Sequence, residues 1–364
     1  MANSHGVALE ADPGLAKNTQ ASRAADELIS DIVALQPWLR EKQAEAERQR
    51  RVPQDTVERL DAIGVYGITM PPRFGGADFS ARDLFRIYEA LGSGCGATSW
   101  TTWAATGGNL WSAAFPEQVV APVYQAPWVG NRTCAVGGST RRLAGTARKV
   151  DGGWMTKGNW FFATASAHAS HAYLAVYLDD ADDSKVGMVL VPREQYMLLD
   201  DWDAMGLAAT GSATIVIKDE LFVPDAQFSS PQILIERLAA LKQLGEPLRP
   251  GGLGRSVMVG SGNAVGMAEH ALELFLQGIG KKPIAYSPYA RQQDAPVTHL
   301  NVGYARLQID SARRVAEAAL DELDRMHAEG RDAVPADLVR FHADAAYVWD
   351  SCATATEMLF KASG

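Results

Sequence analysis

The chain has 364 residues, 47 % hydrophobic and 21 % charged, which is ordinary for a globular enzyme. Its formal charge of −9, without a Lys/Arg run, argues against a nucleic-acid partner. No apolar run approaches the roughly 20 residues that span a bilayer, and the N-terminus lacks signal-peptide features. Cys95, Cys134 and Cys352 are widely separated and odd in number, so we predict buried thiols. We expect a cytoplasmic enzyme of two or three domains, without membrane or nucleic-acid partners.

The first part of the chain has a helical pattern. Residues 1–21 are expected to be disordered. Apolar residues recur at helical spacing in residues 24–39, and Ser80 with Asp83 resembles a capping box before a further helix. We therefore predict a helical N-terminal domain over residues 22–129.

Short strands separated by Gly, Asp and Asn follow in residues 130–228, which predicts a small β domain. Gly152 and Gly153 indicate a tight turn that joins the strands on either side into a hairpin. His168 and His171 are a conceivable metal pair, but no third ligand is visible, so we predict no metal site.

The helical pattern returns after Pro231 in three long segments, residues 255–279, 298–328 and 335–363. The first of them contains several glycines and serines, which allow helices to approach closely. We predict a C-terminal bundle of long helices over residues 229–364.

Three segments in this order make the chain resemble the acyl-CoA dehydrogenase superfamily over nearly its whole length. They are residues 68–76, which end in a Pro-x-x-x-Gly-Gly turn, and residues 157–165 and 205–212. The resemblance implies an α+β fold, with N-terminal helices, a central small β-barrel or sandwich and a C-terminal long-helix bundle. Because the family's bundle usually buries faces against other subunits, it also implies a homo-oligomer, a homotetramer.

Residues 158–165 resemble the Gly-x-Trp-x-Phe-x-Ser-Gly pattern of the two-component monooxygenase branch, with Thr164 and Ala165 replacing the last two residues. This resemblance implies reduced FAD or FMN from a separate flavin reductase, and O2 that forms a flavin C4a-hydroperoxide. The substrate would be a small molecule of secondary metabolism or catabolism, either an aromatic compound to be hydroxylated or an amine or amino sugar to be N-oxygenated.

Two other functions remain open. The first is an acyl-CoA dehydrogenase, which needs a carboxylate base. The family has two positions for this base, and the residue of this chain that matches one of them is Gly254, which cannot act as a base. The other position would lie beyond Gly364, so we expect a bundle that lacks its usual end. A degenerate, non-catalytic member is the third reading, and Ala208, where relatives commonly have arginine, favours it slightly.

The resemblance also implies flavin-site residues. Phe162 would pack on the isoalloxazine ring, while the Thr164 hydroxyl and amides near Ala163 would hydrogen-bond its N5/O4 edge; on a strand, Phe162 and Thr164 share a face. Ser139 and Arg255 are the catalytic candidates, because a hydroxyl and a guanidinium would stabilise the anionic reduced ring and its peroxide adduct. The alternatives are a hairpin with a buried aromatic residue, a plain turn at Ser139 and an ion pair at Arg255.

Trp100 resembles the tryptophan of the branch's Ser-x-x-Trp segment, on the helix beside flavin and substrate. Trp103 follows three residues later and shares part of that helix face, so both would hold an aromatic substrate or a sugar face. The alternative is core packing. Residues 104–109 contain no histidine, whereas several phenol-hydroxylating members have one there, which favours an amine over a deprotonated phenol.

Overall fold

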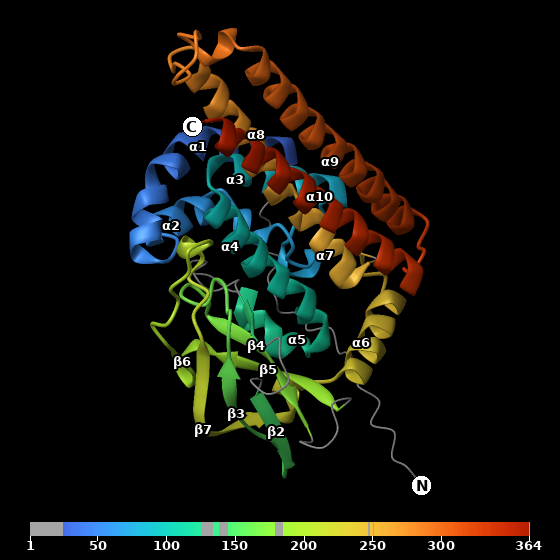
Figure 1. The fold of residues 1–364 in the computed structure, drawn as a ribbon. Coiled ribbons are helices and arrows are strands. Elements are labelled where there is room, and N and C mark those ends of the chain that lie inside the picture. The colour runs from blue at the N-terminus through green and yellow to red at the C-terminus, as the bar shows by residue number, and fades with distance from the viewer. Residues whose placement is uncertain are drawn as a thin grey trace.

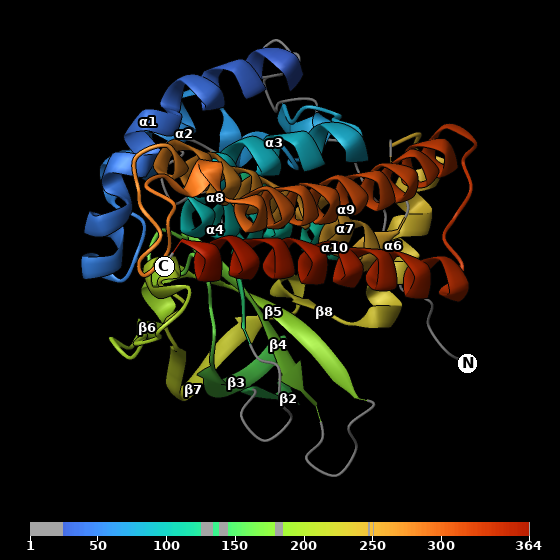
Figure 2. The same ribbon diagram turned by 45° about the horizontal axis from the view of Figure 1, so that its top comes forward.

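The computed structural model describes residues 25–124, 134–137, 145–178, 185–246, 248–249 and 251–363. Helices from the N-terminal and C-terminal parts of the chain form one body. The strands, which lie between these parts in the sequence, form a sheet that packs against this body (Figures 1 and 2). The α+β architecture predicted from the sequence is thereby confirmed. The α-helices of the described residues are α1 (Ala25–Gln49), α2 (Gln54–Ala62), α3 (Ala81–Gly94), α4 (Gly96–Gly107), α5 (Glu117–Val120), α6 (Pro231–Gln243), α7 (Gly252–Gly260), α8 (Gly262–Ile279), α9 (Pro296–Ala328) and α10 (Pro335–Ala362).

The capping box at the start of α3 is confirmed. Ser80 Oγ accepts a hydrogen bond from the Asp83 amide at 3.0 Å, and the Asp83 carboxylate accepts one from the Ser80 amide at 3.2 Å. The α-helix α4 ends at Gly107, and the chain continues as the 3-10 helix η3 (Gly108–Ala114). Two adjacent glycines at this junction explain the change, because glycine is a poor former of α-helix.

The strands of the described residues form one eight-stranded sheet with the order β6-β7-β3-β2-β4-β5-β8, and β1 pairs with β4. The predicted hairpin is confirmed, since β2 and β3 are antiparallel and Gly152 takes the left-handed φ of 71° at the turn. Trp160 is fully buried in the sheet's core and donates its indole N–H to the Ala175 carbonyl at 2.7 Å. The strands are β1 (Cys134–Gly137), β2 (Gly145–Val150), β3 (Gly153–Trp160), β4 (His171–Tyr177), β5 (Val186–Pro192), β6 (Met197–Leu198), β7 (Ile215–Pro224) and β8 (Phe228–Ser229).

The long helix predicted over residues 255–279 is two helices, α7 and α8, which meet at Ser261. The Ser261 hydroxyl donates to the Met258 carbonyl at 2.7 Å, and glycines flank it on both sides, so the side chain competes with the helical ladder at a weak point. The helix α10 packs on α7, α8 and α9 (Figure 2).

Small residues bring α8 close to α3, as the sequence predicted. A Cβ at Gly262 would lie 2.3 Å from the Phe85 carbonyl oxygen, and one at Gly266 would lie 2.1 Å from that of Glu89. Both distances are far inside van der Waals contact. Only glycine fits at these two positions of α8.

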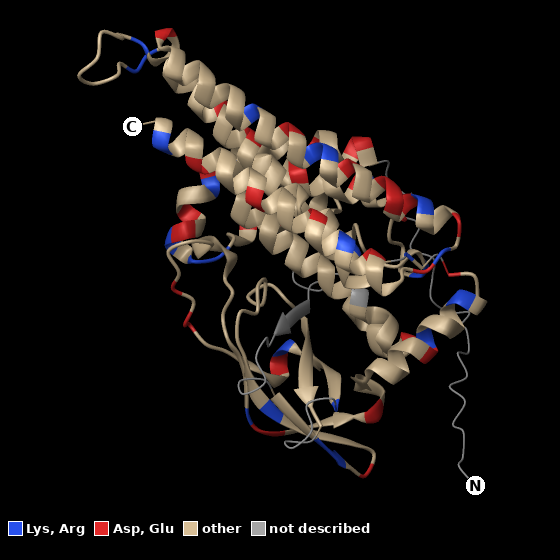
Figure 3. Ribbon diagram, turned by 45° about the vertical axis from the view of Figure 1, so that its right-hand side comes forward, with Lys and Arg blue, Asp and Glu red and all other residues tan. Residues whose placement is uncertain are grey.

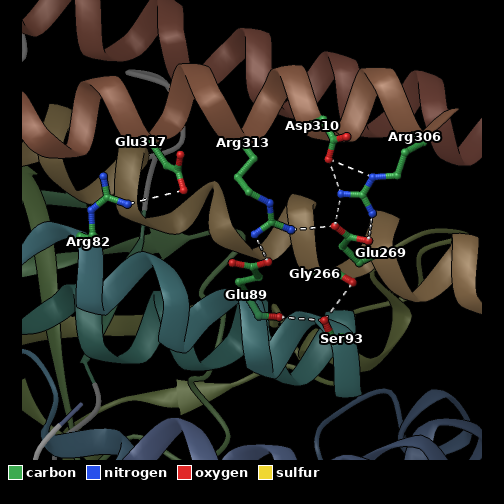
Figure 4. A network of polar contacts seen from close by, with 9 residues as sticks. All are labelled: Arg82, Glu89, Ser93, Gly266, Glu269, Arg306, Asp310, Arg313 and Glu317. Carbon is green, nitrogen blue, oxygen red and sulfur yellow. Dashed lines mark hydrogen bonds and ion pairs between the residues drawn. The ribbon is translucent and has the colours of Figure 1, made fainter. Parts of the chain in front are cut away.

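An ion network fastens α9 to this helix pair (Figure 4). Arg313 of α9 bridges Glu89 of α3 and Glu269 of α8, with 2.7 Å between Arg313 Nη2 and Glu269 Oε1. Arg306 binds both oxygens of Glu269 at 2.9 and 3.0 Å. Burial raises the pKa of Glu89, and the Arg313 charge opposes that shift. Such a network fixes the register of three helices more than it adds net stability.

Charged residues recur along the two longest helices, α9 and α10 (Figure 3). Among the described residues, no helix combines the length and the apolar character needed to cross a bilayer.

Candidate functional site

Three tryptophans wall an apolar cavity of about 440 Å³. Trp100 and Trp103 of α4 have ring centroids 4.9 Å apart, which confirms that they share a face, and Trp349 of α10 meets Trp100 edge-on at 5.8 Å. The Trp103 indole donates to the Ser256 carbonyl at 3.0 Å, which fixes its ring against α7. The other lining residues are Gly96, Leu207, Val257, Gly260 and Met267.

The cavity lies where the helices meet the segment that joins β6 to β7. Leu207 of that segment has a left-handed φ of 59°, a conformation that costs a leucine energy. No carboxylate or imidazole is among the described residues that line the cavity. It therefore suits a planar apolar ring and offers no acid or base.

The segment after β3 differs from the prediction. Pairing of β3 with β7 ends at Trp160, and Phe162 has a φ of 59°, so the expectation that Phe162 and Thr164 share a strand face is wrong. The Ala163 amide donates to the Ala213 carbonyl, and the Thr164 amide donates back to the Phe162 carbonyl at 2.8 Å. Neither amide is left free for a ligand.

Phe162 is 64 % exposed and meets Trp202 edge-on, with ring centroids 6.2 Å apart. The alternative of a buried aromatic residue at Phe162 is therefore excluded. A large apolar ring in a strained backbone conformation at the surface is a typical feature of a binding site. Ser139, the other residue predicted to face the flavin, lies outside the described residues.

The Thr164 hydroxyl belongs to a chain of hydrogen-bonded hydroxyls. Thr164 Oγ1 lies 2.7 Å from Ser212 Oγ, and Ser212 Oγ lies 2.7 Å from Thr210 Oγ1. Thr210 Oγ1 is also 3.0 Å from the Leu207 carbonyl, to which it can donate. Thr164 therefore keeps lone-pair capacity with which its hydroxyl can accept a hydrogen bond from a ligand.

Arg255 lies on α7 and is 8 % exposed. The one hydrogen bond that its guanidinium makes within the described chain is a long one, 3.4 Å from Nη2 to the Phe79 carbonyl. None of the described carboxylates lies within 4.0 Å of the guanidinium, which excludes the ion-pair alternative. Burial, helped by the charge of Arg249, lowers the pKa of Arg255 to about 10. The guanidinium is thus a buried cation with donors to spare.

A hydroxyl–amide cluster beside Arg255 was missed by sequence reasoning. The Tyr88 hydroxyl lies 2.7 Å from Thr106 Oγ1, which is also 2.8 Å from a carbonyl one turn earlier on α4. Asn109 Nδ2 donates to Thr69 Oγ1 at 2.9 Å, and Thr69 donates to the Thr106 carbonyl at 2.6 Å. Hydroxyls and one amide scattered over three segments form no sequence pattern, so only the fold reveals them.

No group of three His, Cys, Asp or Glu side chains in the described chain is arranged to hold a metal ion. His168 and His171 are both partly shielded, and burial lowers the pKa of each. Cys95 and Cys352 are buried free thiols, as predicted, and burial raises the pKa of Cys352 to about 12. The side chain of Cys134 is outside the described part.

His168 is expected to make the protein less stable in mild acid. One ring nitrogen lies 2.9 Å from the Val52 carbonyl and the other 3.2 Å from the Gln54 side chain, and burial lowers the pKa. The unfolded chain, with an imidazole pKa of about 6.5, then binds more protons, so stability is full above that pH and declines as the pH falls toward the folded pKa. Urea midpoints from pH 7.5 to 5 should fall less for His168→Gln than for the wild type. Parallel curves would contradict this prediction.

Two family models match the chain, the acyl-CoA dehydrogenase N-terminal domain over residues 33–118 and its C-terminal domain over residues 258–364. A flavin-dependent monooxygenase oxygenase subunit, HsaA of Mycobacterium tuberculosis, is 27 % identical over 94 % of this chain and 86 % of its own. A resorcinol hydroxylase oxygenase component of Rhizobium is 30 % identical over 54 % of this chain and 47 % of its own. The solved structure of XiaF from Streptomyces, in complex with FADH2 and glycerol, superposes with a TM-score of 0.85 at 26 % identity, covering 93 % of this chain and 85 % of XiaF.

Together these matches cover both helical parts of the chain and the sheet, in the same order along the sequence. The chain belongs to the acyl-CoA dehydrogenase superfamily. Within the superfamily it is an oxygenase subunit of the flavin-dependent monooxygenase branch, as the motif in residues 158–165 predicted.

Proposed function

We propose that this chain oxygenates a planar small molecule with O2 and reduced FAD or FMN, which a separate reductase delivers. The observation that carries the proposal is the cavity of about 440 Å³ walled by tryptophans. The helix α7, which contains the buried Arg255, also contributes residues to the wall of this cavity. A reduced flavin supplies the activation of O2 when it is bound. The protein supplies the position, the charge and the exclusion of water.

Arg255 fits an anionic reduced flavin. Its guanidinium is held at 8 % exposure without a carboxylate partner, so its remaining N–H groups can donate to an anionic ring edge. In such a shielded place a charge-assisted hydrogen bond is stronger than in water. We assign Arg255 the role of stabilising that negative charge.

Thr164 fits the reduced state of the ring in a second way. The N5 atom of a reduced flavin carries a hydrogen, and the Thr164 hydroxyl, hydrogen-bonded to Ser212, has lone pairs that can accept a hydrogen bond. The hydroxyl would therefore accept from N5–H. Phe162 would cover the ring from the exposed side, and Trp100 and Trp103 would hold the substrate.

The substrate class proposed first is an electron-rich aromatic ring. Three indole rings line the described cavity, and stacked or edge-on contacts between aromatic rings are favourable. Because no acid or base lines it, the ring should not need prior deprotonation. The same absence favours N-oxygenation of an amine or amino sugar as a second candidate.

A reductase-coupled assay tests this proposal. The protein, a flavin reductase and NADH would be supplied in turn with indoles, phenols and amines, and oxygenated products would be measured by mass spectrometry. Products from indoles or amines are expected. Turnover of phenols alone would contradict the claim that the site works without a base. Oxidation of an acyl-CoA with a dye acceptor would show that the protein is an acyl-CoA dehydrogenase instead. A lack of reduced-flavin binding and of any product would leave a non-catalytic protein.

We propose a homotetramer, supported by an unpartnered stripe on α9. Val297, Leu300, Tyr304 and Leu307 are spaced on one helix face, and each is 56–59 % exposed. Analytical ultracentrifugation is expected to give a mass of four chains. A monomer at micromolar concentration would contradict the proposal.

A further inference from the structure

Arg237 is a buried cation for which the proposed reaction has no use. It lies on α6, is 6 % exposed, and donates from Nε to the Ala113 carbonyl at 3.1 Å. Its terminal nitrogens meet no acceptor within hydrogen-bond distance in the described chain, and no Asp or Glu there pairs with it. Arginine is rarely this buried without an anionic partner, because desolvating an unpaired charge is costly.

The positive charge of Arg73 makes the burial of a charged Arg237 less favourable. Burial lowers the pKa of Arg237, and the charge of Arg73 lowers it further. Arg73, from η2 (Pro72–Phe74), lies 3.3 Å from the Glu246 carboxylate. Glu246 therefore balances the charge of Arg73 but not that of Arg237, and neither guanidinium can lose its proton at physiological pH. One positive charge is left over at this junction.

An aromatic pair borders Arg73. The Arg73 guanidinium lies over the Phe74 ring, 4.9 Å from its centroid, and Phe74 packs against Tyr124 with centroids 4.7 Å apart. Arginine stacked on an aromatic ring is held rigidly, which reduces the entropy lost on binding an anion.

Two short segments connect this junction to the cluster beside Arg255. Arg73 follows Thr69 in the chain, and Ala113, which accepts from Arg237, follows Asn109 in η3. Four residues of 3-10 helix rise about 8 Å, which is within the length of one small molecule. A ligand that reaches Asn109 and Thr69 of that cluster would have its far end near Arg237.

We propose that Arg237 and Arg73 form an anion-binding subsite that receives a carboxylate or phosphate group. The anion is assigned to the substrate, and this assignment rests on the proposed oxygenase function. The other source of the same chemistry is the phosphate of the flavin.

Calorimetric titration of the whole, flavin-free protein with benzoate and with inorganic phosphate tests the subsite. The wild type should bind at least one probe, Arg237→Met should bind it at least tenfold more weakly, and Arg237→Lys should be intermediate. Lys242→Met is the matched control, since it removes an exposed charge from the same helix, and it should bind as the wild type does. Equal titrations for wild type and Arg237→Met would overturn the proposal.

The stability of Arg237→Met is a second measurement. Without added anion its urea midpoint should equal or exceed that of the wild type, because an unpaired buried charge is removed. Benzoate or phosphate should raise the midpoint of the wild type only. A variant destabilised to the same extent with and without anion would show a structural role instead.

The source of the anion is decided with flavins and substrates. Arg237→Met should bind reduced FMN and reduced riboflavin, which lacks the phosphate, as the wild type does. With an accepted substrate acid and its amide, the variant should raise KM for the acid alone and leave kcat unchanged. Selective loss of reduced FMN would assign the anion to the flavin and overturn the substrate version. Calorimetry needs no turnover, so a failed oxygenase assay would not be mistaken for a failed subsite.

Discussion

Arg255→Met is expected to weaken the binding of reduced flavin by about 10- to 100-fold, since a hydrogen bond to a charged group contributes about 1.5–3 kcal/mol. The guanidinium is 8 % exposed and has no carboxylate partner among the described residues, so its N–H groups are available to donate to the ligand. Methionine fills a similar volume without charge. Anaerobic titration with reduced FMN and reduced FAD measures the change.

Arg148→Met is the control for the loss of one positive charge. Arg148 lies on β2 with its side chain 64 % exposed and pairs with Glu220, so its removal should leave flavin affinity unchanged. Arg255→Lys should recover part of the affinity, because an ammonium keeps the charge but not the planar set of donors. An unchanged affinity in Arg255→Met would remove Arg255 from the site.

Local chemistry explains which elements could be predicted. The α3 capping box and the turn at Gly152 involve residues three apart or adjacent, so they can be read from a short window. The break at Ser261 was not predicted, because Gly260, Ser261 and Gly262 were interpreted only as small residues that allow close packing of helices. The turn at Phe162 was missed because it depends on where pairing with β7 ends.

The candidate site divides in the same way. Trp100 and Trp103 are one turn apart on one helix, so helical geometry alone brings them together. Trp349 reaches the same cavity only because α10 packs on α7 and α8, a relation that no local window contains. The burial of Arg255 is likewise a tertiary property, since its sequence neighbours give no sign that it would lack an ion-pair partner.

Gly266→Ala is expected to lower the free energy of unfolding by about 1–3 kcal/mol, the usual result of overpacking a tight interior. The new methyl group would lie 2.1 Å from the Glu89 carbonyl oxygen and 2.8 Å from the Ser93 amide nitrogen. Both are backbone atoms of α3, so the two helices must move apart. That movement would stretch the bond from the Ser93 hydroxyl to the Gly266 carbonyl, now 3.2 Å, and disturb the Arg313 network (Figure 4).

Gly278→Ala makes the same substitution on the same helix where a Cβ would meet nothing within 4 Å. It should raise the free energy of unfolding by up to about 1 kcal/mol, since alanine is the better helix former. Urea unfolding of both variants separates crowding from helix propensity, and equal effects would refute close packing of α3 and α8. Met267, next to Gly266, lines the tryptophan cavity, so a displaced α8 should also lower turnover in Gly266→Ala but not in Gly278→Ala.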